Sequence, residues 1–140
     1  MNDKIQVVQQ CYAEFGKGNP QGVINLLKDD VLWIDPGYPE IPYAGRRNGK
    51  ENVISFFAGL AEAVTLHVFE PREFFCDGNN VFVRGYFEGS SNTTGKAFQS
   101  HFMMQWEVED GKIKYYEAYL DTAKVANAIR QAEPVGASAK

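Results

Sequence analysis

The sequence has little cysteine, little histidine and no excess of positive charge, and each shortage excludes a class of protein. Two cysteines, Cys11 and Cys76, are too few for a disulfide framework and lack metal-ligand spacing. The two histidines, His67 and His101, likewise have no ligand partner at metal spacing, so we expect no metal. The net charge of −4 argues against nucleic acid, because phosphate binding needs a basic stripe. No apolar run is long enough to span a bilayer, so we expect no membrane partner.

The remaining composition is typical of a globular chain with a surplus of aromatic residues. Its 140 residues suit one domain with a core, and we place that domain at 1–132 and a flexible, small and polar tail at 133–140. The ten Phe, seven Tyr and two Trp exceed what a minimal core needs, so part of them is expected to line a cavity. The polar start at residues 2–4 does not resemble a signal peptide, and we expect a cytoplasmic location.

The first part of the sequence has helical spacing. Apolar residues predict a helix from residue 3 to about 15, and a second one that begins at Asn19-Pro20 and ends at Asp29-Asp30, with Val23, Leu26 and Leu27 on its buried side. Residues 36–48 are predicted to form a stiffened loop. Asn48 and Glu51 then form a variant of the capping box and predict a third helix.

From residue 64 onward the sequence favours strands. We expect strands at 65–75, 81–88, 97–109 and 113–120, separated by turns such as Asp77–Asn80 and Glu109–Lys112, and a short final helix capped by Asp121. Helices followed by an antiparallel meander predict an α+β fold in which helices pack on one face of a curved sheet. Such an arrangement leaves a conical pocket suited to a small apolar molecule.

The segment 31–37 (Val-Leu-Trp-Ile-Asp-Pro-Gly) contains the best candidate for a functional residue. It predicts a short buried strand that ends on Asp35. A carboxylate among Trp, Ile and Leu is costly to keep ionised, and burial raises its pKa toward values useful for proton transfer. The alternative is that Asp35 only starts a turn, because Asp-Pro-Gly favours turns by itself. The two interpretations remain open at this stage.

Several segments together resemble the SnoaL-like branch of the nuclear transport factor 2-like superfamily. They are the strand end at 32–37, the helix start Gly-Lys-Glu-Asn-Val-Ile-Ser-Phe-Phe at 49–57, and the closing Asp-Gly-Lys-Ile and Tyr-Leu-Asp-Thr segments. The branch includes ketosteroid isomerases, SnoaL-type polyketide cyclases and limonene epoxide hydrolases. The resemblance covers roughly residues 3–130 and implies a cone-shaped barrel, with a curved antiparallel sheet around three N-terminal helices and a short C-terminal helix. It is specific for the fold and not for one activity, because this fold hosts many functions.

The comparison with ketosteroid isomerases assigns individual positions. Asp35 matches the general base at the end of a strand. The position of the oxyanion tyrosine falls on Cys11, with Tyr12 one residue away, and the second oxyanion donor falls on Ser100, before His101. The resemblance therefore implies a retained base and a replaced enolate-stabilising pair.

Other candidates follow from the strand and helix faces. We expect a substrate to contact seven side chains: Tyr12, Trp33, Tyr43, Ser100, Phe102, Trp106 and Tyr116. For Tyr12, and for the strand face with Phe102 and Trp106, the alternative is a plain role in the core. The opposite face of the strand at 97–109 carries His101 and Met103 and is expected to form a homodimer contact. Hydrolase chemistry of the limonene epoxide type requires an Asp-Arg-Asp set, for which this chain offers Asp35, Arg72 and Asp121. In SnoaL-type cyclases the acid/base Asp lies near Asp121, where a helix-capping role competes.

Two functional hypotheses result. The first is a cofactor-free isomerase, cyclase or hydrolase that acts on a small apolar carbonyl compound, with Asp35 as acid/base. The second is a non-catalytic small-molecule binding module or a structural dimerisation module.

Overall fold

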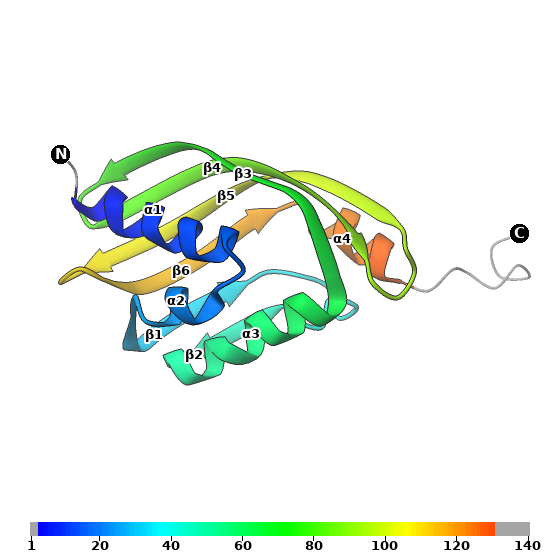
Figure 1. Cartoon of the computed structure of the whole chain (residues 1–140), viewed down its shortest axis with the longest axis horizontal. Coiled ribbons are helices and arrows are strands. Elements are labelled where there is room, and N and C mark those ends of the chain that lie inside the picture. The colour runs from blue at the N-terminus through cyan, green and yellow to red at the C-terminus, as the bar shows by residue number, and fades with distance from the viewer. Residues whose placement is uncertain (1–2, 131–140) are drawn as a thin grey trace, which may run out of the picture.

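The structure, a computed structural model, describes residues 3–130 and consists of a curved sheet covered by helices (Figure 1). The six strands are arranged in the order β2-β1-β6-β5-β4-β3, and the sheet is not closed into a barrel. The helices are α1 (Asp3–Gly16), α2 (Pro20–Ile24), α3 (Lys50–Ala63) and α4 (Thr122–Ile129). The strands are β1 (Leu27–Asp35), β2 (Gly45–Asn48), β3 (Val64–Asp77), β4 (Asn80–Ser91), β5 (Ala97–Glu109) and β6 (Lys112–Leu120).

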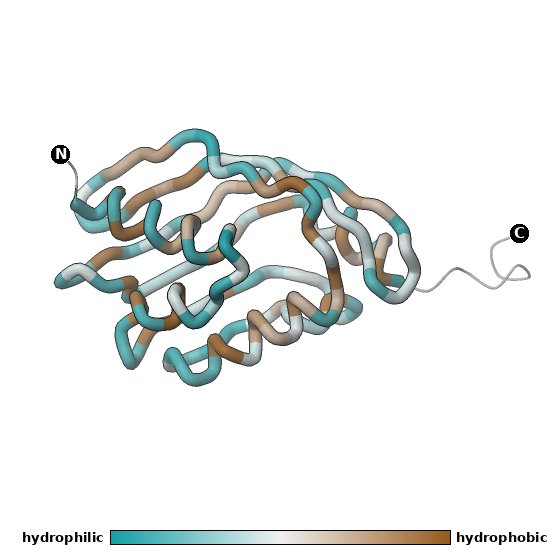
Figure 2. Tube along the Cα trace, in the orientation of Figure 1, coloured by the Kyte–Doolittle hydropathy of each residue, from teal (hydrophilic) through white to brown (hydrophobic). Residues whose placement is uncertain are grey.

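The predicted meander is confirmed as β3 to β6, in which each strand pairs antiparallel with the next. Along β5, buried and exposed residues alternate, so one face of the sheet points toward the helices and the other toward solvent. Figure 2 shows hydrophobic and hydrophilic residues interspersed along the helices and strands. The sheet is curved, and the pairing of β3 with β4 has two shifts of register. A Cβ on Gly85 would lie 2.3 Å from the Phe102 ring, so this ring occupies the space that a side chain at position 85 would need.

Helices α1, α2 and α3 cover one face of the sheet, and α4 lies at the end of the sheet that is farthest from the start of α1 (Figure 1). In α1 the buried residues Val8, Cys11 and Tyr12 recur at the spacing of one helical face. The side chain of Asp121 caps α4 by accepting a hydrogen bond from the Lys124 backbone N–H at 3.4 Å, as predicted. The α+β fold class is therefore confirmed.

The predicted second helix was too long. It ends at Ile24, and Leu27 is the fully buried first residue of β1, which begins four residues earlier than residue 31. The carbonyl of Leu26 accepts a hydrogen bond from the Ile113 N–H at 2.8 Å, so pairing with β6 draws this segment out of the helix. β1 and β6 are parallel, which departs from the purely antiparallel sheet that was predicted.

The predicted loop at 36–48 was also wrong in its second part. Residues 45–48 form β2, which pairs antiparallel with β1. Asn48 is consequently a strand residue and not the cap of α3. The cap position is Gly49, whose φ of 89° favours glycine and which offers no side chain for capping.

The predicted tail at 133–140 lies outside the described residues. Among the helices that the structure describes, none is long and apolar enough to cross a membrane.

Candidate active site in the aromatic cavity

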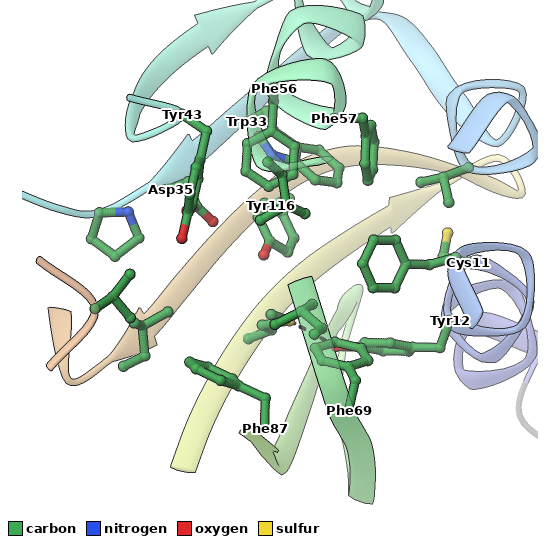
Figure 3. A pocket seen from close by; sticks show the side chains of 18 of the residues that line it. Cys11, Tyr12, Trp33, Asp35, Tyr43, Phe56, Phe57, Phe69, Phe87 and Tyr116 are labelled. Carbon is green, nitrogen blue, oxygen red and sulfur yellow. Dashed lines mark hydrogen bonds between the residues drawn. The ribbon is translucent and has the colours of Figure 1, made fainter. Parts of the chain in front are cut away.

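A cavity of about 90 Å³ lies between the helices and the concave face of the sheet. Its wall is almost entirely apolar and rich in aromatic rings, and within residues 3–130 Asp35 is the one charged side chain that lines it. Figure 3 shows rings from α1, β1, α3 and the sheet converging on this space. The volume is below the roughly 150 Å³ of a cavity that holds benzene. A ligand containing a ring therefore needs some lining side chains to move.

Asp35 is the last residue of β1 and is only 6% exposed. Burial raises the pKa of its carboxyl from 3.8 to about 7, and two neighbours oppose this effect. The positive charge of Arg47 and a hydrogen bond with the Tyr116 hydroxyl both favour the ionised form. Near neutral pH both protonation states are therefore populated, which suits a group that takes up and returns a proton.

Arg47 was not singled out by the sequence; it does not line the cavity, but its charge lowers the pKa of Asp35. It lies on β2 opposite Trp33 of β1, and its Nη1 donates a 2.7 Å hydrogen bond to the carbonyl of Tyr43. Its guanidinium lies 5.6 Å from the centroid of the Phe56 ring. Arg47 thus contacts three residues of the cavity wall, namely Trp33, Tyr43 and Phe56. Its position near Asp35 depends on β2, which the sequence did not predict.

Tyr43 and Tyr116 lie at the Asp35 end of the cavity (Figure 3). Burial and the negative charge of Asp35 raise the pKa of both hydroxyls, so both remain protonated and able to donate. Trp33, from the same strand as Asp35, stacks on Tyr116 with ring centroids 3.9 Å apart. The predicted pocket residues Trp33, Tyr43 and Tyr116 are therefore brought together around the carboxyl.

The α1 end of the cavity contains Tyr12, whose polar atoms are already paired. The Tyr12 hydroxyl donates to Met104 Sδ at 3.1 Å and accepts a hydrogen bond from Trp106 Nε1 at 3.0 Å. Both Tyr12 and Trp106 line the cavity, as expected. Cys11 also lines the cavity, and burial raises the pKa of its thiol to about 12, so this thiol stays protonated.

Ser100 and Phe102 face inward but are not among the described residues that line the cavity. The Ser100 hydroxyl donates to the His101 carbonyl at 2.6 Å and accepts from the Asp121 N–H at 3.0 Å. It therefore joins β5 to the start of α4. Phe102 stacks on Phe69 with ring centroids 5.2 Å apart, so it supports the wall from behind.

The structure does not assemble the hydrolase set. Arg72 is exposed and pairs with Glu70 at 2.8 Å, and Asp121 caps α4, so neither joins Asp35 in the cavity. His101 is exposed on the outer face of the sheet, as predicted. Over residues 3–130, no cluster of three or more His, Cys, Asp and Glu side chains is arranged to hold a metal ion.

Comparison with protein families supplies the decisive observation. A sequence model of the SnoaL-like domain matches residues 8–116. The chain belongs to the SnoaL-like domain family. The resemblance stated from the sequence is therefore confirmed. Comparison with curated proteins returns no match.

Solved structures place this SnoaL-like domain among proteins with the same fold. It is similar to an NTF2-like protein of Burkholderia xenovorans LB400, with 27% identity, a TM-score of 0.82, and coverage of 91% of this chain and 96% of that one. It is similar to TerC, co-crystallised with polyporic acid, with 25% identity, a TM-score of 0.79, and coverage of 91% and 98%. A ketosteroid isomerase-like protein of Catenulispora acidiphila is 15% identical, with a TM-score of 0.73 and coverage of 87% and 90%, and this likeness concerns the fold alone.

Proposed function

We propose that this SnoaL-like domain is a cofactor-free enzyme that moves a proton on a small, apolar carbonyl compound, with Asp35 as acid/base. The observation that carries the proposal is the carboxyl itself: it is buried in an aromatic cavity and has a pKa of about 7. A base with a pKa close to the working pH combines a useful ionised fraction with a useful proton affinity. Isomerisation, cyclisation and hydrolysis each use such a group.

The proposed chemistry begins with removal of a proton from the carbon next to the carbonyl group. Asp35 accepts that proton, and negative charge develops on the carbonyl oxygen. The protonated hydroxyl of Tyr43 lies at the same end of the cavity and can donate to this oxygen, whereas the Tyr116 hydroxyl is already hydrogen-bonded to Asp35. Asp35 then returns its proton to a different carbon, which completes an isomerisation.

The ligand is proposed to be uncharged and to contain a flat ring. Aromatic walls favour ring stacking, and within the described lining there is no positive side chain to neutralise an anion. Co-crystallisation of the relative TerC with polyporic acid supports small-molecule binding by this family.

The second hypothesis, a binding module without catalysis, is favoured by a separate observation. The hydroxyls nearest the positions of the family's oxyanion pair are already used inside the protein: Tyr12 bonds to Met104, and Ser100 bonds to His101. In a binding module Asp35 would orient the ligand, and no proton would be exchanged.

Hydrogen exchange separates the two functions. Acetophenone is incubated with the protein in D₂O near pD 7, and the methyl signal is followed by proton NMR. If the protein is an enzyme, it accelerates deuterium uptake at the methyl carbon, and Asp35→Asn abolishes this acceleration. Asp30→Asn is the control, because Asp30 is exposed on the same strand, and it should preserve the acceleration. If acetophenone binds but Asp35 does not accelerate its deuterium exchange, the catalytic proposal is refuted and the binding module remains.

We also propose a homodimer formed through the outer face of the sheet. Met103 is 38% exposed and lies opposite Tyr119, which is 51% exposed, so large apolar surface lies on neighbouring strands. Sedimentation equilibrium tests the proposal: the wild type is expected to be dimeric, and Met103→Glu is expected to shift the population toward monomer. A monomeric wild type would refute it.

A further inference from the structure

The indole N–H of Trp33 stands out among the polar groups of the cavity. Trp33 is 2% exposed, and its Nε1 has no hydrogen-bond partner within the part of the chain that the structure describes. Buried N–H groups are rarely left unpaired, and each exception requires an explanation. The second tryptophan of the chain shows the ordinary situation, since Trp106 Nε1 donates to the Tyr12 hydroxyl at 3.0 Å.

The position of Trp33 gives its unpaired N–H a direction. Trp33 and Asp35 are two residues apart on β1, so their side chains leave the same face of the strand about 7 Å apart. Both line the cavity. Figure 3 shows the indole nitrogen, in blue, at the end of the ring that lies toward Asp35 rather than toward Phe57. The unpaired donor and the carboxyl therefore belong to the same end of the site.

Two other donors of the cavity have partners within the protein. The Tyr116 hydroxyl hydrogen-bonds to Asp35, and the Tyr12 hydroxyl donates to Met104 Sδ. A ligand oxygen that binds either of them competes with an existing bond. A ligand that binds the N–H of Trp33 breaks no such hydrogen bond, because this donor is unpaired before the ligand arrives.

We propose that the Trp33 indole N–H binds the carbonyl oxygen of an uncharged aromatic ketone, and that it supplies the oxyanion donor that Cys11 and Ser100 do not. The inference rests on the proposed uptake of a small apolar carbonyl compound and adds the atom that holds its oxygen. With that oxygen on Nε1, the neighbouring carbon lies on the Asp35 side of the ligand. A cation is disfavoured at this point, because the positive end of the N–H dipole faces it.

Two probes of similar shape test the proposal. Acetophenone contains the carbonyl oxygen, and ethylbenzene has the same carbon skeleton without it. Dissociation constants are measured by ligand-observed NMR for wild type and Trp33→Phe, which keeps an aromatic ring and removes the N–H. We expect the preference for acetophenone over ethylbenzene to fall by about tenfold in Trp33→Phe. Loss of packing alone would weaken both probes equally and leave this ratio unchanged, which would overturn the inference.

Trp106→Phe is the matched comparison, because it removes an N–H that is already bonded to Tyr12. We expect it to change both affinities without this loss of preference. A measurement on the wild type does not depend on the folding of any variant: the indole ¹H–¹⁵N signal of Trp33 moves downfield with acetophenone and not with ethylbenzene. An unmoved signal with acetophenone bound overturns the role of Trp33 and leaves ligand uptake intact. Failure of wild type to bind either probe refutes the proposed uptake and this inference together.

Discussion

Replacement of Asp35 by Asn is expected to stabilise the protein at alkaline pH and to lose that advantage in acid. Burial raises the pKa of Asp35 from 3.8 to about 7, so between these values the folded state holds a proton that the unfolded state has released. The stability associated with the neutral carboxyl is therefore complete below about pH 4 and is lost as the pH rises through 7. Asn carries no charge at any of these pH values and avoids the loss.

The magnitude follows from the size of the pKa change. One pKa unit corresponds to about 1.4 kcal/mol, so an increase from 3.8 to about 7 costs the ionised form about 4 kcal/mol of unfolding free energy. The advantage of Asp35→Asn over wild type should grow by about 4 kcal/mol between pH 4 and pH 8. An amide at this buried site introduces its own cost, and that cost is the same at every pH.

Urea denaturation at half-unit pH steps measures this difference. Asp30→Asn removes the same charge from an exposed position on β1 and is expected to show no comparable trend. A difference between Asp35→Asn and wild type that stays constant within about 1 kcal/mol would refute the raised pKa. A ¹³C titration of the Asp35 carboxyl near the free-peptide value of about 3.9 would refute it independently.

Three further substitutions test the supports of the site and of the fold. Arg47→Gln removes a positive charge that favours ionised Asp35, so the pKa of Asp35 should rise further by ¹³C NMR, whereas Arg84→Gln on the exposed surface should leave it in place. Leu27→Ala should lower the free energy of unfolding by about 2–5 kcal/mol in urea, because Leu27 is fully buried; a cost below about 1 kcal/mol would contradict this packing. Asp121→Ala should cost about 1 kcal/mol in the same assay through loss of the α4 cap, and equal stability of Asp121→Ala and Asp121→Asn would argue against capping.

Local patterns in the sequence predicted much of the fold, because the period of apolar residues determines which face of an element is buried. The alternation along 97–109 correctly separated inward Ser100 and Phe102 from outward His101 and Met103. The turn at Asp110-Gly111 joins β5 and β6 as predicted, and Asp110 and Gly111 both have positive φ. Asp35 was found because a carboxylate at the end of an apolar strand is unusual wherever that strand is placed.

Only the tertiary structure decided what surrounds Asp35, because its neighbours come from distant parts of the chain. The parallel pairing of β1 with β6 places Tyr116 beside Trp33, and β2, absent from the prediction, brings Arg47 to the same end. Hydrogen bonds to His101 and Asp121 engage the hydroxyl of Ser100, whereas the N–H of Trp33 finds no partner among residues 3–130. The sequence thus determined which residue carries the charge in the cavity. Long-range strand pairing determined the pKa of that residue and which donors remain available to a ligand, since both depend on contacts that local periodicity does not encode.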